Sequence, residues 1–208
     1  MEQVVQVYSR PYDPARPVVC MDEQPKQLIA EARHAIRTSH GEQRIDHEYI
    51  RHGVGYIWMF NEPLGGWRDV RVSDRHTAID WAQQVKALVD DPRYAQADRI
   101  TLVCDQLNTH MLGSFYHAFA ATEALRLANR IELVHTPKHG SWLNIAECEL
   151  SVLTRQCLAR RIPELATIRD QAQAWAAARN AAQAGVNWQL TTDQARTKLK
   201  HLYPKIVE

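Results

Sequence analysis

Two short apolar runs, each ending in an aspartate, constrain the fold of this 208-residue chain more than any other feature. They are residues 18–22, Val-Val-Cys-Met-Asp, and residues 101–105, Thr-Leu-Val-Cys-Asp. Continuous apolar runs of this length are typical of buried parallel strands, and ligands in open α/β sheets bind at the carboxyl ends of such strands. We therefore expect Asp22 and Asp105 to lie side by side, where two like charges favour a divalent cation. The alternative is that each aspartate only forms the turn that closes its strand.

A third acid lies on a predicted helix. Ser141 is a good N-cap, so a helix is expected to begin near Trp142. The spacing of the apolar positions places Glu147 on the core-facing stripe of this helix and Glu149 toward solvent. A carboxylate on an apolar face is costly unless it is paired or binds metal. The alternative is that Glu147 sits at the edge of the stripe and reaches water or an arginine.

The order of predicted elements indicates one α/β domain. A helix-prone stretch follows the first strand through Arg37, and a hairpin turns at residues 63–66. Thr77 and Asp80 resemble a capping box at the start of a helix. The remaining strands are expected at 54–60, 67–73, 99–104 and 131–135. Three further helices are expected: one at about 111–128, one from the Ser141 cap to about 161, and a last long one that ends at Ala184 with Gly185 as its cap. This order predicts a ribonuclease H-like fold, in which a mixed central sheet with an antiparallel hairpin edge and parallel strands is flanked by helices.

Composition is that of a soluble globular protein, with 45% hydrophobic and 24% charged residues. No apolar run approaches a membrane span and no signal peptide is apparent, so we expect a cytoplasmic protein. The cysteines are scattered and are expected to be free thiols; they are Cys20, Cys104, Cys148 and Cys157.

Charge is unevenly placed along the chain, although its formal net charge is only +1. From Ser151 onward, nine Lys and Arg residues stand against four Asp and Glu residues. A basic C-terminal segment suits contact with phosphates. The alternative is an ordinary solvated helix surface.

Three motifs, in order, resemble the DDE catalytic domain of a mariner-like bacterial insertion-sequence transposase. They are Cys20-Met21-Asp22-Glu23, Cys104-Asp105-Gln106-Leu107-Asn108-Thr109-His110, and Thr136 to Asn144 running into Glu147. Further likeness at residues 10–14, 61–68, 187–190 and 199–204 extends the resemblance over nearly the whole chain. By this likeness, Asp22, Asp105 and Glu147 take the places of the catalytic, metal-binding acids of the family.

The resemblance implies metal-dependent DNA cleavage and strand transfer. Three carboxylates suit two Mg²⁺ or Mn²⁺ ions, with Asp22 and Asp105 bridging or flanking both ions and Glu147 holding one. Water would attack a DNA phosphodiester and leave a 3′-hydroxyl, which would then attack target DNA.

Candidate DNA contacts lie around the acids and in the basic segment. They are Asn108, His110, His139, Trp142, Arg155, Arg160, Arg161, Lys198 and Lys200. Asn108 and His110 could instead cap the next helix. His139 could meet DNA or a metal-bound water, or could be an ordinary loop histidine. Trp142 could stack on a base or anchor its helix.

One departure from the family concerns DNA recognition. Related transposases carry helix-turn-helix modules ahead of the catalytic domain, whereas about twenty residues precede Asp22 here. We expect residues 1–16 to be linker-like, 17–161 to form the core, and 162–208 to form a basic helical extension of one domain. The chain would then be a truncated copy, half of a split reading frame or a cloned domain. A homodimer, or a partner transposase subunit carrying the recognition module, would supply the rest.

Two other functions remain open. The chain could be a ribonuclease H-like nuclease without strand transfer, or a non-catalytic transposase remnant that binds DNA or a partner subunit. The three intact acids argue against decay of the site, while the missing module argues for loss of autonomous function. In each case the protein is expected in the cytoplasm, associated with the nucleoid when it binds DNA.

Overall fold

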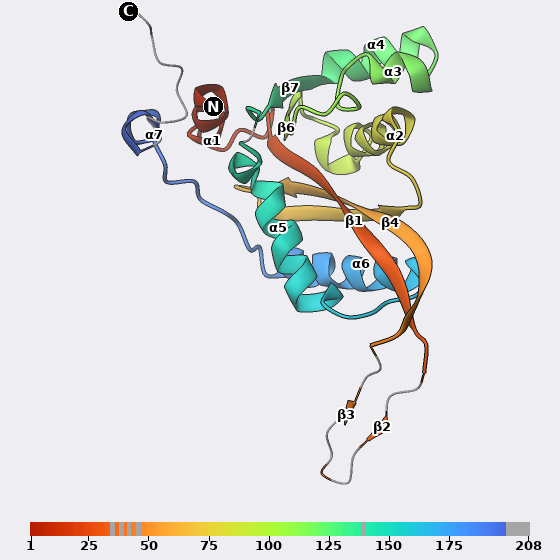
Figure 1. Cartoon of the computed structure of the whole chain (residues 1–208). Coiled ribbons are helices and arrows are strands. Elements are labelled where there is room, and N and C mark those ends of the chain that lie inside the picture. The colour runs from red at the N-terminus through yellow and green to blue at the C-terminus, as the bar shows by residue number, and fades with distance from the viewer. Residues whose placement is uncertain (34–35, 38–39, 41–42, 45–46, 139, 199–208) are drawn as a thin grey trace, which may run out of the picture.

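A computed structural model describes residues 1–33, 36–37, 40, 43–44, 47–138 and 140–198. Its centre is a five-stranded sheet of order β5-β4-β1-β6-β7 (Figure 1). The strands are β1 (Val18–Glu31), β4 (Tyr49–Glu62), β5 (Trp67–Ser73), β6 (Ile100–Cys104) and β7 (Ile131–His135), and β2 (Ile36–Arg37) pairs with β3 (Gln43–Arg44) in a separate ribbon. The β1–β4 and β4–β5 pairs are antiparallel, whereas β1–β6 and β6–β7 are parallel. The predicted mixed sheet is confirmed.

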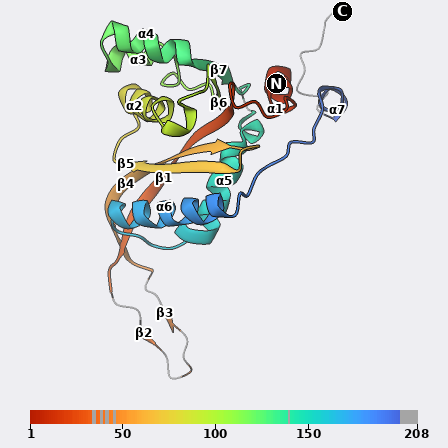
Figure 2. The same cartoon turned by 180° about the vertical axis from the view of Figure 1, so that it is seen from behind.

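Helices cover both faces of the sheet (Figures 1 and 2). One layer holds α2 (Ala78–Val89), α3 (Ser114–Ala118) and α4 (Ala121–Arg130). The other layer holds α5 (Ile145–Leu153) and α6 (Leu165–Ala181). Helix α1 (Glu2–Tyr8) lies beside α7 (Thr192–Lys198). Strand alternation divides the core accordingly. Val19 and Met21 pack in the α2 layer, whereas Cys20 between them packs in the α5 layer. Among the described residues, no helix is both long and apolar enough to cross a bilayer.

Residues 23–31 continue β1, so the helix-prone reading of this stretch is wrong. β4 pairs with β1 along its length, from Cys20 opposite Asn61 to Glu31 opposite Tyr49. This long pairing overrides the polar composition of the segment. Pro25 is tolerated because β6 pairs with β1 only as far as Cys20, so the other edge of the strand is open there.

Several helix boundaries also differ from the predictions. The expected helix at 111–128 is divided into α3 and α4, because Phe119 adopts an extended conformation. Ser141 begins a 3-10 turn, and α5 starts only at Ile145 with Asn144 as its N-cap. After α5 the chain forms a π-helical turn over Thr154–Leu158 rather than continuing as an α-helix to residue 161. The last long helix ends at Ala181, and Gln183, not Gly185, takes the left-handed conformation that follows it.

Other local predictions are confirmed. The hairpin joins β4 to β5, the capping box of Thr77 and Asp80 begins α2, and all four cysteines are free. The expected boundaries at residues 16 and 161 do not coincide with gaps in packing. Val4 and Val5 of α1 and Ile168 of α6 are fully buried in one core cluster with Cys20.

Glu149 holds α5 against the rest of the molecule. Its carboxylate lies 3.0 Å from Arg68 Nε and 2.9 Å from an Arg179 terminal nitrogen. The Arg68 side chain is fully buried, and the Glu149 side chain is 4% exposed. The expectation that Glu149 faces solvent is therefore wrong, because two arginines from β5 and α6 satisfy its charge inside the protein.

We predict that Glu149→Ala lowers the free energy of unfolding by about 3–5 kcal/mol, because it leaves a buried arginine unpaired. Thermal unfolding should occur about 10 °C lower. Glu147→Ala, two residues away on the exposed side of α5, is the matched control and should change stability by less than about 0.5 kcal/mol. Equal losses in the two variants would contradict this account of how α5 is held.

Candidate active site

Two neighbouring parallel strands bring Asp22 and Asp105 to one edge of the sheet. Val18 pairs with Thr101 and Cys20 with Val103. The register ends at that pair, and Asp105 directly follows Cys104, the last residue of β6. Because side chains alternate along a strand, Asp22 shares the face of Cys20, which packs in the α5 layer. The expectation that the two strands are neighbours is confirmed.

Helix α5 brings the third acid to the same edge. The side-chain amide of its N-cap, Asn144, donates a 2.8 Å hydrogen bond to the carbonyl of Met21, directly before Asp22. The first turn of α5 is thereby tied to β1. Glu147 in that turn is exposed and not on the buried stripe. The buried positions are instead Ile145, Ala146, Glu149, Leu150 and Leu153.

A cleft of about 440 Å³ lies between β1 and α5. Asp22 and Glu147 both line it, and Arg155 contributes a positive charge to the lining. The other lining residues are Glu23, Gln24, Ser141, Leu150, Ser151 and Thr154. An open cleft with carboxylates on two walls suits a charged substrate reached from solvent.

Electrostatic strain is concentrated at Asp22. Burial raises the pKa of its carboxyl to about 7, and the negative charges of Glu23, Asp105 and Glu147 act in the same direction. A 3.0 Å hydrogen bond from the Glu23 amide to Asp22 Oδ1 opposes this shift only in part. The ionised form of Asp22 is therefore costly unless a cation accompanies it.

His110 is a buried partner of Asp105 and not an accessible DNA contact. Its Nδ1 lies 2.5 Å from Asp105 Oδ1, its Nε2 lies 3.2 Å from Glu23 Oε2, and its side chain is fully buried. Burial alone would lower the pKa of His110, but the hydrogen bond to Asp105 and the contact with Glu23 outweigh burial and raise it. The assignment of His110 as a DNA contact is wrong for this reason.

The donor set fits a hard divalent cation by its chemistry, since Asp22, Asp105 and Glu147 offer only carboxylate oxygens. The raised pKa of Asp22 reports that these charges interact. The prediction that the three acids converge on one point is nevertheless not confirmed. Within the described part of the chain, no three His, Cys, Asp or Glu side chains are grouped closely enough to hold a metal. Two features keep the acids apart: their like charges repel one another, and His110 holds one oxygen of Asp105.

The other expected DNA contacts are dispersed. Arg155 lines the cleft, whereas Arg161 pairs with Glu31 at 2.6 Å and Lys198 lies on α7 beside α1. Asn108, Trp142 and Arg160 are exposed outside the lining of the cleft. His139 and Lys200 lie outside the described residues. Of the candidates that lie within the described residues, the structure brings only Arg155 to the wall shared by Asp22 and Glu147.

The sequence analysis did not identify Glu23, Gln24 or Thr154 as parts of the site. Gln24 and Thr154 face each other, with a 3.4 Å contact between the Thr154 hydroxyl and the Gln24 side-chain oxygen. The position of Glu23 directly after Asp22 is the one local signal that could have identified it. The positions of Gln24 and Thr154 depend on how α5 packs on β1, which no local pattern encodes.

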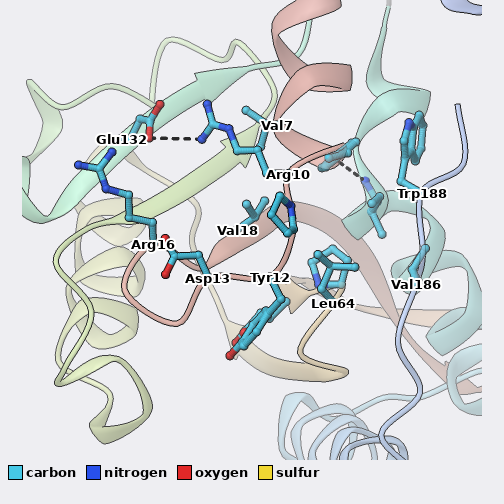
Figure 3. A pocket seen from close by; sticks show the side chains of 15 residues that line it. Val7, Arg10, Tyr12, Asp13, Arg16, Val18, Leu64, Glu132, Val186 and Trp188 are labelled. Carbon is cyan, nitrogen blue, oxygen red and sulfur yellow. Dashed lines mark hydrogen bonds and ion pairs between the residues drawn. The ribbon is translucent and has the colours of Figure 1, made fainter. Parts of the chain in front are cut away.

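A second cavity, of about 330 Å³, lies at the opposite end of the parallel strands (Figure 3). Its wall includes Arg10, Tyr12, Glu132 and Trp188, and Val18 at the start of β1. Because ligands in open α/β sheets bind at the carboxyl ends of strands, the cleft beside Asp22 is the better candidate active site.

Comparisons with known proteins agree with the geometry. A family model described as DDE superfamily endonuclease matches residues 17–169. The fold is similar to a chain of the Mos1 mariner paired-end complex with Mn, with a TM-score of 0.55 and 17% identity over 88% of this chain and 54% of that chain. A chain of a pre-cleavage Mos1 transpososome is also similar, with a TM-score of 0.39 and 15% identity over 91% of this chain and 61% of that chain.

This chain spans about half the length of the first Mos1 chain that it matches. No curated protein sequence matches it. The first structural similarity, together with the observed strand order, confirms the predicted ribonuclease H-like fold.

We predict that Asp22→Asn stabilises the protein in the presence of a chelator, and increasingly so as the pH rises from about 4 to about 7. The folded wild type keeps a proton on Asp22 up to a pKa of about 7, whereas the unfolded chain releases it near 3.8. Wild-type stability therefore falls across this window, and the asparagine variant lacks that contribution. The difference should reach at most about 4 kcal/mol at neutral pH.

Chemical unfolding of both proteins at several pH values measures this difference. Asp170→Asn, at an exposed position on α6, is the control and should differ from wild type by a constant amount. A pH-independent difference for Asp22→Asn would contradict the charge repulsion at Asp22.

Proposed function

This chain belongs to the DDE superfamily endonucleases, and we propose that it is the catalytic domain of an insertion-sequence transposase that cuts and joins DNA strands. The observation that carries the proposal is that Asp22 within β1 and Asp105 directly after β6 belong to paired parallel strands, while Asp22 and Glu147 line one cleft. Three carboxylates without a nucleophilic side chain among them suit metal-assisted phosphodiester chemistry.

Asp22, Asp105 and Glu147 would hold Mg²⁺ or Mn²⁺, which we expect as two ions. When bound, such ions supply charge neutralisation at the phosphate and activation of the attacking oxygen. Asp22 presents its carboxylate from within β1, whereas Asp105 follows the last residue of β6 and is held by His110. Glu147 comes from a helix anchored at Met21 by its N-cap and at Arg68 by Glu149. The residues thus fix the position at which a scissile phosphate would bind.

DNA binding by this chain is proposed to be mostly independent of sequence. Arg155 is placed to meet a phosphate in the cleft. Phosphate contacts supply affinity but carry no base information. Recognition of transposon ends would then require helix-turn-helix modules, provided elsewhere in a longer protein, by a second copy or by a partner subunit. The protein would act in the cytoplasm, on nucleoid DNA.

We predict that Asp105→Asn abolishes cleavage of DNA while the fold remains intact. The amide keeps the shape of the side chain but loses the charge that a divalent ion requires. Nicking of linear and branched DNA in Mg²⁺ or Mn²⁺, and joining of a supplied 3′-hydroxyl end to target DNA, are the measurements.

Asp170→Asn is the matched control for Asp105→Asn and should retain wild-type cleavage. Nicking by the Asp105→Asn variant at the wild-type rate would defeat the proposed mechanism. Cleavage by the wild type with no joined product would instead favour a nuclease that lacks strand transfer. Absence of both activities, with DNA binding retained, would favour the non-catalytic remnant.

A second prediction concerns the cleft arginine. Arg155→Gln should weaken binding to all DNA sequences alike and reduce the slope of log affinity against log salt concentration by about 1, as expected for one lost phosphate contact. Titration of labelled duplexes at several salt concentrations measures both quantities. Arg16→Gln removes an equal charge beside the second cavity, at the far end of the strands, and should leave binding unchanged. A loss confined to one DNA sequence would mean that Arg155 reads bases.

A further inference from the structure

His110 occupies an enclosed position beneath the candidate metal-binding edge. Its fully buried ring lies between two carboxylates, with Nδ1 2.5 Å from Asp105 Oδ1 and Nε2 3.2 Å from Glu23 Oε2. An ionised carboxylate can only accept, so Nδ1 donates its hydrogen to Asp105. The contact with Glu23 has the distance of an ion pair but not the geometry of a hydrogen bond.

The surroundings fix the orientation of the His110 ring. Trp81 of α2 stacks against it, with 5.6 Å between ring centroids and 28° between ring planes. The backbone amide of His110 donates to the carbonyl of Leu107, and its carbonyl lies 2.8 Å from His135 Nε2 at the end of β7. A ring held by stacking and by hydrogen bonds to its backbone cannot turn away from Asp105 without disrupting the α2 layer.

We propose that His110 is a positioning residue that holds the Asp105 carboxylate at the metal-binding edge, with Glu23 holding the far side of the ring. The inference rests on the proposed function, because it takes Asp105 as a metal ligand. It adds two residues, His110 and Glu23, that act through Asp105 and do not themselves bind metal or DNA.

The two aspartates are held in comparable ways. Asp22 Oδ1 accepts from the Glu23 amide, and Asp105 Oδ1 accepts from His110. Each carboxylate thus has one oxygen fixed by the protein and the other left to bind a cation. Asp105 needs this support more than Asp22, because it follows the end of β6 and starts a connecting segment, whereas Asp22 lies within β1.

Strand geometry explains the role of Glu23. Adjacent residues on a strand point to opposite faces, so Asp22 faces α5 while Glu23 faces the layer that contains His110. The side chain of Glu23 is 7% exposed. A buried carboxylate on that face, with His110 as its neighbour, serves to orient the ring. Residues that hold a metal ligand in place typically contribute a factor of about 10–100 to metal affinity.

The two nitrogens of His110 can be tested separately with the full chain. His110→Asn places an amide nitrogen near the position of Nδ1 and keeps the donor to Asp105, whereas His110→Gln reaches the position of Nε2 and loses that donor. Binding of Mn²⁺ is measured by calorimetry without DNA, and unfolding is measured in a chelator. We expect His110→Gln to bind Mn²⁺ at least about 10-fold more weakly than wild type. The Mn²⁺ affinity of His110→Asn should remain within about 3-fold of the wild-type affinity. Such a rescue is expected only if the hydrogen-bond donor to Asp105 is the feature that supports metal binding.

A purely structural role for His110 would change the chelator-state stability of the two variants without separating their Mn²⁺ affinities. Equal affinities, or weaker binding by His110→Asn, would overturn the proposal. If neither variant folds, Glu23→Gln and Glu23→Ala replace them, since only the glutamine keeps an acceptor for Nε2. Binding at least about 3-fold weaker for the alanine variant supports the proposal, and equal binding overturns it.

Asp105→Asn separates this inference from the proposed function. If that variant binds Mn²⁺ as the wild type does, the metal site itself is misassigned, and the inference fails with it. If it loses Mn²⁺ while the two His110 variants behave alike, only the role of His110 is wrong.

Discussion

The buried contact of Glu149 with Arg68 and Arg179 sets the geometry on which the candidate site depends. Helix α5 carries two glutamates two residues apart, and its rotation about its own axis decides which of them faces the cleft. A buried carboxylate is stable only where opposite charges and hydrogen bonds compensate for its lost hydration. Arg68 of β5 and Arg179 of α6 provide this compensation at the position of Glu149. Glu149 therefore turns inward. Glu147 lies on the other side of the helix and lines the cleft together with Asp22 and Arg155.

The sheet provides the second constraint, through the unequal lengths of its pairings. β1 pairs with β4 down to Glu31 but with β6 only as far as Cys20. Beyond Cys20, the face and the open edge of β1 are available, and the start of α5 packs there through the bond from Asn144 to Met21. The cleft is the space left between a strand that continues and a neighbour that has ended. The same discontinuity lets Glu23 reach His110 from the other face.

The parts of this structure that the sequence predicts are those set by short-range rules. Strand order, the capping box of α2, the hairpin and the pairing of β1 with β6 all follow from local patterns joined by chain connectivity. The starting residue of α5 does not follow from local patterns, because Ser141 and Asn144 are both competent caps. Only the hydrogen bond from Asn144 to Met21 favours the later start. The burial of Glu149 and His110 was missed for a similar reason, since their partners are remote in sequence or lie in another layer. Pairing with β4 likewise decides that residues 23–31 form a strand.

The distribution of positive charge shows why a count of residues overstates the basic character of the C-terminal segment. Arg179 forms an ion pair with Glu149, Arg161 with Glu31, and Arg196 with Glu2. These cations neutralise acids from the first part of the chain, so part of the excess counted from Ser151 onward is used within the fold. Arg155 is the member of the segment that lies at the acidic cleft. A phosphate approaching that cleft meets carboxylates first, so attraction of DNA to the site depends on cations bound by those carboxylates and on charge supplied from outside the cleft.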